Sequence, residues 1–234
     1  QVVTTGEDGI PYVVKEWFQG NECNTRSRED ILKSLEAMAQ LHTVMQMERE
    51  DGMPGTNLLE ECRKHNRELR KTRKFVQKKK MKNPFEELLA ASITLFLEAG
   101  ERMVKELEDS DYERFCKEHR QAVCHGDCNQ HNIIFTREDI GFMNFDYWHC
   151  GPQTEDLCLF MRKILEKHNW DPELGRRMAE QYNRKRSLSA EEWKHLKLCL
   201  SYPWRYWKLV NYYASNQKVW ISRKNIEKIE QATA

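Results

Sequence analysis

The sequence lacks any long apolar run. No segment approaches the ~18 consecutive apolar residues of a membrane helix, and the first residues, QVVTTGEDG, have neither the basic nor the apolar region of a signal peptide. The net charge is also small, at +1 over 234 residues. These absences argue against a membrane protein and against secretion by a signal peptide. They predict a cytoplasmic globular chain that buries a core in one large domain or two small ones.

Paired metal-binding motifs are missing as well. The chain has 8 cysteines but is too large to need disulfide staples, which predicts reduced thiols. Cysteine and histidine do gather between positions 124 and 150, and zinc prefers these ligands. No CxxC pair or HxxxH pair is present, so small buried thiols are the preferred interpretation and a zinc site is the alternative. The cluster consists of Cys124, His125, Cys128, His131, His149 and Cys150.

Helical periodicity covers most of the chain. Ser27, followed three residues later by Asp30, is typical of a helix N-cap, and Asn83-Pro84 separates two helices. His42 flanks the apolar face of the first helix and is expected to be a packed histidine. We predict helices over 27–47, 58–80, 85–107, 153–168, 173–184, 189–213 and 222–231, and a shorter helix or a turn over 111–119.

Short strands are predicted in two places. Residues 1–18 are rich in β-branched and aromatic residues around a glycine turn, which is typical of a hairpin. A hairpin alone is not stable, so it should border a sheet whose other strands follow later or lie outside this chain. Residues 20–22 are predicted to be a linker. Further strands are predicted at 122–124, 132–135 and 140–145, so the fold class is α+β, a helical body with a small sheet.

The predicted helix over 58–80 carries a run of lysines and arginines, a pattern found in nucleic-acid-binding proteins. Here the charges surround the helix, and Glu60, Glu61 and Glu68 interrupt them. The whole chain is also nearly neutral. A solvated helical face is therefore the preferred interpretation, and neither a nucleic acid nor a membrane is expected as a partner.

The stretch from Val123 to Asp156 is the most informative about function: VCHGDCNQHNIIFTREDIGFMNFDYWHCGPQTED. A short apolar strand precedes the motif HGD, Asn132 follows its Asp127 by five residues, and an apolar hairpin ends in NFD. A carboxylate that deprotonates a hydroxyl, followed by oxygen ligands for Mg²⁺, is the arrangement that phosphoryl transfer needs. The alternative, that both residues only cap the loop, is less favoured at this joint spacing.

This stretch resembles the catalytic loop and metal-binding strand of the aminoglycoside phosphotransferase and choline kinase branch of the protein kinase-like fold. The run GPQTEDL at 151–157 extends the resemblance, as does the segment 12–20 with its following helix. Within that branch, the runs NFDYWHCGP and GNEC are most similar to CotS-type spore coat proteins. The resemblance is specific over about 122–160 and looser elsewhere.

The resemblance implies a role for each motif residue. Asp127 and His125 would be the catalytic residues, with Asp127 as the base, and Asn132 would bind Mg²⁺. Asp156 would hold the catalytic loop through backbone N–H groups, since a buried Asp needs several donors to remain charged. The ATP-binding hinge would be formed by Glu16, Trp17 and Phe18.

The sequence departs from the family pattern at the metal strand, where Asn144 stands in place of an Asp. A neutral amide holds a divalent cation less well than a carboxylate, so metal binding should weaken. Asp146 would share a face with Asn144 in an extended strand and is the alternative ligand. The expected cofactors are ATP and Mg²⁺, with Asn132, Asn144 and Asp146 as candidate metal ligands.

A second departure is that no glycine-rich phosphate loop and no strand lysine precede the hinge. A kinase-like site needs both to cover the phosphates, and in this fold they lie upstream of the hinge. We therefore predict that residues 1–20 are a remnant of the nucleotide-binding N-terminal lobe with its hinge. Residues 21–234 are then the helical C-terminal lobe, which carries the catalytic loop and the metal-strand hairpin.

Aromatic residues near the C-terminus are candidates for an acceptor pocket, because ring faces can cage a cationic amine. Several of them have spacings that also suit a core. Trp204 and Trp207 are the preferred pocket residues, together with Tyr147 and Trp148, which follow the metal strand. The full set comprises Tyr202, Trp204, Tyr206, Trp207, Tyr212, Tyr213 and Trp220.

The predicted function is an ATP-dependent phosphotransferase of spore-coat type that acts on a small-molecule hydroxyl. The alternative is a catalytically impaired pseudokinase that serves as a binding or assembly module of the spore coat, with coat proteins as partners. Asn144 and the absent phosphate loop favour reduced activity. A zinc protein is the third interpretation.

Overall fold

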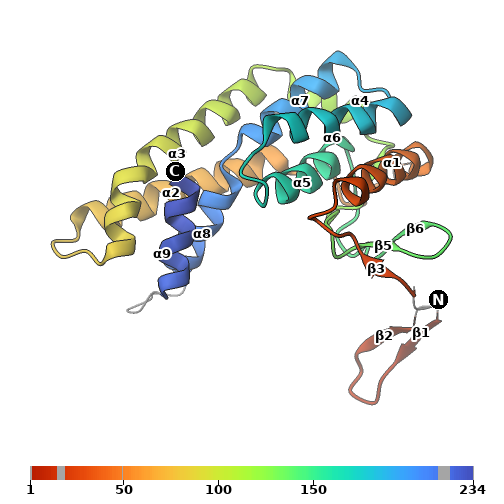
Figure 1. Cartoon of the computed structure of the whole chain (residues 1–234), viewed down its shortest axis with the longest axis horizontal. Helices are drawn as coiled ribbons and strands as arrows, with labels where there is room; N and C mark the ends of the chain where they lie inside the picture. Colours follow the sequence, from red (N-terminus) through yellow and green to blue (C-terminus); the bar gives the residue numbers. More distant parts are fainter. Residues whose placement is uncertain (1, 15–18, 49, 216–221, 234) are drawn as a thin grey trace.

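The computed structural model describes residues 2–14, 19–48, 50–215 and 222–233. Small antiparallel sheets accompany a mostly helical body, which confirms the α+β class (Figure 1). The elements are β1 (Val2–Thr5), β2 (Pro11–Val14), β3 (Asn21–Glu22), α1 (Arg28–Val44), α2 (Leu58–Lys78), α3 (Pro84–Glu108), α4 (Tyr112–Glu118), β4 (Val123–Cys124), β5 (Ile133–Phe135), β6 (Ile140–Phe142), β7 (His149–Cys150), α5 (Thr154–Leu165), α6 (Pro172–Lys185), α7 (Ala190–Ser201), α8 (Trp204–Ser215) and α9 (Arg223–Thr233).

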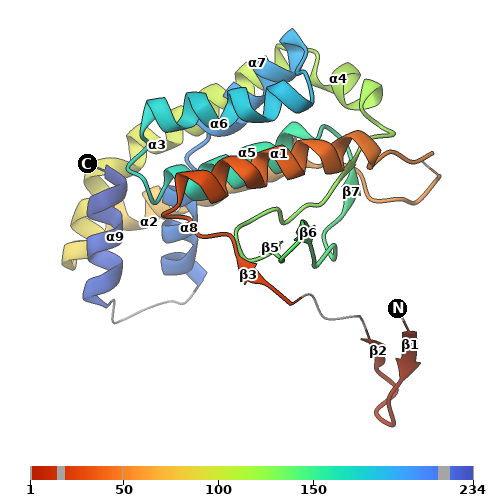
Figure 2. The same ribbon diagram turned by 45° about the vertical axis from the view of Figure 1, so that its right-hand side comes forward.

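The larger of two apolar clusters holds α1, α5, α6 and α7 together (Figure 2). It contains Leu35 and Met38 from α1, Phe160 and Ile164 from α5, and Tyr182 from α6, all of them buried. Burial of one side chain of this size contributes about 1.5–3 kcal/mol. The cluster therefore fixes α5 against α1 and α6, and α5 carries much of the site described below.

The second cluster joins the long pair α2 and α3 to the C-terminal helices α8 and α9. Its buried members include Leu69 from α2, Ile93 from α3, Val210 from α8 and Ile229 from α9. These contacts bring α8 alongside α2 and α9 alongside α3.

Two helices begin at the residues expected from the sequence. The backbone N–H of Asp30 donates to Oγ of Ser27 at 3.1 Å, and Asn83 and Glu86 form a reciprocal capping box at the start of α3. Each cap satisfies N–H groups that the first helical turn leaves unpaired. The N-cap at Ser27 and the separation at Asn83-Pro84 are confirmed.

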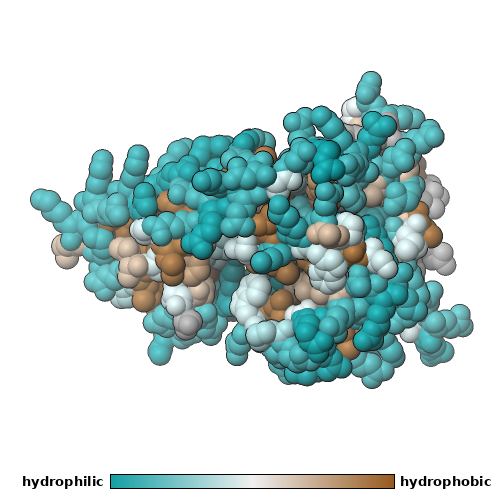
Figure 3. Space-filling model, turned by 90° about the horizontal axis from the view of Figure 1, so that it is seen from above, coloured by the Kyte–Doolittle hydropathy of each residue, from teal (hydrophilic) through white to brown (hydrophobic). Residues whose placement is uncertain are grey.

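The basic residues of α2 point away from the core, as predicted. Cys62, Leu69 and Val76 form part of its buried side, whereas Arg67 and Lys71 are exposed. Figure 3 shows one face of the molecule as largely hydrophilic, with scattered hydrophobic patches. Within the described part of the chain, no helix is both long enough and apolar enough to span a membrane.

The prediction of one helix over 189–213 is wrong, because the structure divides this segment into α7 and α8. Pro203 lies at the break, and Tyr202 before it is extended, with φ −71° and ψ 136°. Proline has no N–H to donate and disfavours helical geometry in the preceding residue. Apolar residues continue on both sides of Pro203, so periodicity did not mark the break.

The expected linker at 20–22 is also wrong, because Asn21 and Glu22 form β3 and pair with Phe135 and Ile134 of β5. The N-terminal hairpin does not border this sheet, since β1 and β2 pair only with each other among the described residues. A strand of two residues depends on its partner rather than on its own propensity. The local sequence therefore gave no sign of β3.

The predicted strand over 140–145 is too long. β6 ends at Phe142, and Asn144 adopts a left-handed conformation with φ 65°. Asparagine tolerates this region better than most residues. The chain turns here and returns as β7, which pairs with β4 and which the sequence did not predict.

A buried histidine in α7 makes the fold sensitive to acid. His195 is 3% exposed, its Nδ1 lies 2.7 Å from Oγ1 of Thr154, and burial lowers its pKa to about 4 although Glu155 opposes the shift. An unfolded His titrates near pH 6.5. The unfolded chain therefore binds more protons between pH 6.5 and 4, and the stability falls by up to about 3 kcal/mol as the pH drops through this range.

Urea unfolding at pH 7 and pH 4.5 measures this effect. We expect His195→Gln to lose less stability between the two pH values than the wild type, because its amide does not titrate. Equal losses in both proteins would assign the acid sensitivity to other groups.

Candidate active site

Asp156, in the first turn of α5, anchors the predicted catalytic loop. Its carboxylate is 1% exposed and accepts hydrogen bonds from the backbone N–H groups of His125 at 2.5 Å and Gly126 at 2.9 Å. Nε2 of His42 lies 3.3 Å away. Burial alone would raise the pKa of Asp156, but His42 and the two N–H groups outweigh burial and lower it. An ionised carboxylate thus ties α5 to the loop.

Buried polar side chains behind Asp156 connect α1 and α6 to the loop. The hydroxyl of Tyr182 lies 2.7 Å from Nδ1 of His42. Nε2 of Gln153 donates to the backbone carbonyls of His42, Met45 and Val123 at 3.0–3.1 Å. The sequence predicted only packing for His42 and indicated no role for Tyr182 or Gln153. The one sequence feature that could have indicated a role for Gln153 was its position in the run GPQ before α5.

Gly126 allows the loop to turn beneath the segment after β6. It adopts φ 80°, and a Cβ at this position would lie 1.9 Å from the carbonyl oxygen of Tyr147. Both the left-handed backbone and the close approach require glycine. The HGD motif therefore has a steric reason for its central residue.

Asp127 follows this turn with its side chain partly buried. Its carboxylate accepts hydrogen bonds from Nδ2 of Asn129 at 2.9 Å and from Nδ2 of Asn132 at 3.0 Å. Oδ1 of Asn132 accepts in turn from Nδ2 of Asn144 at 2.9 Å. Asp127, Asn132 and Asn144 thus meet in one hydrogen-bonded chain.

His125 lies behind the loop rather than in a cleft. Its ring is fully buried and packs on Phe145 with ring centroids 4.3 Å apart. Nε2 lies 2.9 Å from the carbonyl oxygen of Met143, and Nδ1 accepts from the backbone N–H of Asp127 at 3.2 Å. Both nitrogens are therefore engaged within the protein, which suits a positioning residue better than a group that contacts substrate.

The same contacts determine how well this group would hold Mg²⁺, which prefers carboxylates and other hard oxygen ligands. Nδ2 of Asn144 faces Oδ1 of Asn132, so the two amides satisfy each other and bring no negative charge. Asp146 is exposed on a turn beyond β6, and the extended strand that would align it with Asn144 is absent. Asn132 and Asn144 therefore do not fit a carboxylate-type Mg²⁺ site.

The cysteines near the loop are core residues. Cys124, Cys128 and Cys150 are all buried, and burial raises the pKa values of the Cys124 and Cys128 thiols well above their usual range. A thiolate, the form that binds zinc, is therefore disfavoured. In the described ranges no group of three or more His, Cys, Asp or Glu side chains is placed to hold a metal ion.

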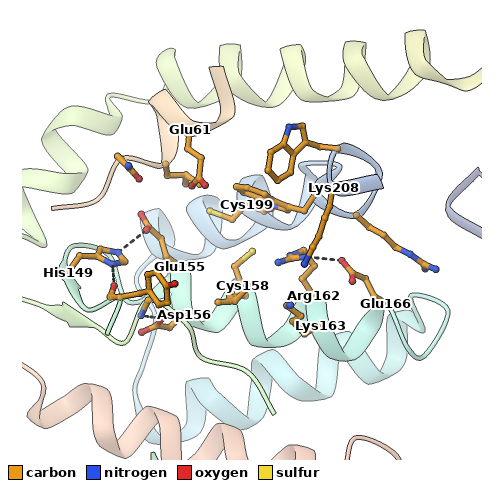
Figure 4. Close-up of a pocket in the computed structure, with 18 of the residues that line it drawn as sticks. Glu61, His149, Glu155, Asp156, Cys158, Arg162, Lys163, Glu166, Cys199 and Lys208 are labelled. Atoms are coloured by element: carbon orange, nitrogen blue, oxygen red, sulfur yellow. Dashed lines mark hydrogen bonds and ion pairs between the residues drawn. The ribbon is translucent and has the colours of Figure 1, made fainter. Parts of the chain in front are cut away.

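A cavity of about 1160 Å³ opens beside the loop, between α2, α5 and α8 (Figure 4). Gly126 and Asp146 line it on the loop side. The four residues predicted for the acceptor pocket also line it, namely Tyr147, Trp148, Trp204 and Trp207. The loop thus borders a space large enough for a small-molecule acceptor.

Most of the other aromatic candidates belong to the core. Tyr202, Tyr206 and Tyr213 are buried, and their hydroxyls bond within the protein. Trp220 lies outside the described residues, as do Glu16, Trp17 and Phe18, which were predicted to form the ATP-binding hinge.

A family model for the phosphotransferase enzyme family matches residues 2–199. The chain belongs to this family. The match includes the loop with Asp127 and Asn132 and the helix with Asp156. No curated protein matches the sequence.

Solved structures share the fold of this phosphotransferase family member. An aminoglycoside phosphotransferase from Alicyclobacillus acidocaldarius has a TM-score of 0.81 at 20% identity, with 98% of this chain and 71% of that chain covered. The ethanolamine kinase of Plasmodium vivax has a TM-score of 0.60 at 16% identity, with 95% and 65% covered. An amicoumacin kinase in complex with AMP-PNP, Ca²⁺ and Ami has 0.54 at 11%, with 93% and 62% covered. This chain thus spans about two thirds of their length.

Replacing Asn144 by Asp is expected to create a stronger cation site. The carboxylate would face Oδ1 of Asn132, an arrangement that is repulsive until a cation lies between the two groups. At an effective dielectric of ~20, a unit charge pair at ~4 Å is worth about 4 kcal/mol before desolvation. A third of that energy raises affinity about tenfold.

Thermal unfolding with and without Mg²⁺ tests this expectation without requiring catalysis. Asn144→Asp should gain more from Mg²⁺ than the wild type, and Asp146→Ala should respond like the wild type. If Asp146→Ala instead abolishes the Mg²⁺ response of the wild type, the metal ligand is Asp146 rather than residue 144.

Proposed function

We propose that this protein transfers the γ-phosphate of ATP to a hydroxyl group of a small molecule, with Asp127 as the general base. The observation that carries this proposal is the carboxylate of Asp127, which two amides hold in place directly after Gly126, a residue that lines the cavity. An ionised Asp in this position can orient a hydroxyl and accept its proton. Membership of the phosphotransferase enzyme family supports the assignment.

In the proposed reaction the acceptor hydroxyl gives its proton to Asp127 while its oxygen bonds to the γ-phosphorus. The bond between that phosphorus and the β,γ-bridging oxygen breaks, and ADP leaves. Asn129 and Asn132 hold the carboxylate in one orientation, and Asp156 holds the backbone that carries it. Such positioning is the main contribution of a protein to phosphoryl transfer.

A second function, binding without turnover, is favoured by the contact between Asn144 and Asn132. A site without a carboxylate at residue 144 neutralises the phosphates of a nucleotide less well. A protein of this kind would retain the fold and the cavity as a binding or assembly module. This is the pseudokinase alternative.

The resemblance to CotS-type proteins supports a finer proposal, association with a spore coat and with coat proteins as partners. It further supports a division in which residues 1–20 are a remnant of the nucleotide-binding lobe with its hinge. Residues 21–234 then form the helical C-terminal lobe that carries the catalytic loop and the metal-strand hairpin. A fluorescent fusion produced in sporulating cells should mark the spore surface. Uniform fluorescence in the mother cell would contradict coat association.

Acceptor-dependent formation of ADP tests the proposed reaction. The protein is incubated with ATP, Mg²⁺ and a panel of small hydroxyl compounds, and phosphorylated product is identified by mass spectrometry. Phosphorylation of at least one acceptor is expected. Binding of nucleotide or acceptor without any product would favour the pseudokinase alternative.

A further inference from the structure

The cavity beside the catalytic loop has two ends of opposite charge (Figure 4). Glu61, Glu155 and Asp156 lie at the end near His149, and Asp146 also lines the cavity. The other end lies between α5 and α8, with α9 beside it, and contains one acid among several cations. Arg162, Lys163, Glu166 and Lys208 lie at this end, and Arg205 of α8 and Lys228 of α9 also line the cavity.

Two tryptophan rings of the cavity already contact other side chains of the protein. The guanidinium of Arg162 lies 5.7 Å from the ring centroid of Trp204, and His65 stacks on Trp207 with centroids 3.4 Å apart. One face of each ring is therefore closed to a cationic amine. Fewer ring faces are open for such a cage than the sequence suggested for Trp204 and Trp207.

Only one cation of this end has an acidic partner within the cavity lining. Arg162 pairs with Glu166 at 2.8 Å. Neither Lys163 nor Lys208 forms an ion pair with an acidic residue in the described part of the chain, although Lys163 is partly buried. Burial and then the charges of Lys208 and Arg162 lower the pKa of Lys163. Cations crowded in this way gain from an anion that binds between them.

The basic end also lies within reach of the catalytic loop. Lys163 is seven residues after Asp156 on α5, a rise of about 10 Å at 1.5 Å per residue, and Asp156 bonds directly to the backbone of the loop. Side chains on a helix lean towards its N-terminus, which for Lys163 is the direction of the loop. A molecule of modest size can therefore span both sites.

We propose that the acceptor of this protein carries an anionic group, a carboxylate or a phosphate ester, which binds between Lys163, Lys208 and Arg162 while a hydroxyl of the same molecule lies against Asp127. The hydroxyl half of this statement rests on the proposed phosphotransferase function. The anionic half rests on the charge, the pairing and the position of the three cations, and it is testable without turnover.

Calorimetric titration of the whole chain, without ATP, compares four probes. Glycerol 3-phosphate and glycerate carry a phosphate ester and a carboxylate, glycerol has neither charge, and ethanolamine is cationic. We expect at least one anionic probe to bind about tenfold or more tightly than glycerol, since each charge-assisted contact is stronger than a neutral one. The anion that binds more tightly shows whether the site prefers a phosphate ester or a carboxylate. Tighter binding of ethanolamine, or equal binding of all four, would overturn the proposal.

Variants locate the binding. Lys163→Met and Lys208→Met should each weaken the favoured anion several-fold, and Lys208→Glu, at an exposed position, should weaken it further. Lys71→Met, which removes an exposed lysine of α2 away from the cavity, is the matched control and should bind like the wild type. Equal affinity in all four variants would also overturn the proposal.

Turnover is measured separately with ATP, Mg²⁺ and the favoured anion. Anion binding that depends on Lys163 and Lys208 but yields no phosphorylated product would retain the anion site and reject the proposed phosphotransfer. Phosphorylation of ethanolamine in preference to both anions would retain phosphotransfer and reject the anion site.

Discussion

Replacing Asp127 by Asn is expected to lower kcat for phosphotransfer by about 10²- to 10⁴-fold, the usual contribution of a general base. The amide has nearly the same shape as the carboxylate but cannot accept the proton of an acceptor hydroxyl. One of its two terminal atoms is also a donor, so it loses one of the hydrogen bonds that Asn129 and Asn132 now give to the carboxylate. Nucleotide affinity should change little, because the base acts on the acceptor.

The measurement is kcat for ADP formation with the best acceptor, together with the Kd of the nucleotide. Glu138→Gln, at an exposed position of the turn between β5 and β6, is the matched loss of one carboxylate and should retain wild-type kcat. Unchanged kcat in Asp127→Asn would remove Asp127 from the reaction. A parallel loss of kcat and of nucleotide affinity would instead indicate damage to the loop.

Replacing Asp156 by Ala is expected to destabilise the protein by about 3–5 kcal/mol, the range found when one partner of a buried charged group is removed. The substitution leaves the N–H groups of His125 and Gly126 and the ring of His42 without their common acceptor. Against a typical stability of about 5–15 kcal/mol, this is a large fraction. The loop that carries Asp127 would lose its link to α5 at the same time.

The pH dependence of this effect has a definite sign. The pKa of Asp156 is lower in the folded protein than in the unfolded chain, so its ionised form stabilises the fold above the unfolded value near 3.9. That contribution disappears as the pH falls below it. Urea unfolding should therefore show a large difference between wild type and Asp156→Ala at pH 7 that shrinks below pH 4.

Glu180→Gln provides the control for Asp156→Ala. Glu180 pairs with Arg176 on the exposed side of α6, where an ion pair is worth about 0–1 kcal/mol. A similar loss of stability in both variants would contradict the special role of the buried carboxylate.

The local sequence carried enough information for the grouping of Asp127, Asn132 and Asn144. Only short loops and strands connect these three residues, so the chain cannot carry them far apart in space. The local sequence also predicted the N-cap at Ser27 and the break between two helices at Asn83-Pro84, because caps and breaks depend on residues within one turn. The same local rules failed after β6, which ends at Phe142, because the left-handed Asn144 turns the chain and removes Asp146 from the expected face.

Features that depend on distant partners were beyond the sequence. β3 exists because β5 lies beside it, and Gln153 matters because the carbonyls of α1 and β4 converge on its amide. The local sequence contains no pattern that predicts either of these contacts.

By itself, the sequence determined the phosphotransferase motif, its HGD turn and the mostly helical architecture, since each follows from residues close together in the chain. Only the tertiary structure decided the character of the cavity. Arg162 and Lys163 lie on α5 and Lys208 on α8. These two helices line the same cavity because α5 packs on α7, α7 on α3, α3 on α2 and α2 on α8. Charge in a cleft is set by which side chains the packing brings face to face, and that depends on contacts between residues far apart in the sequence.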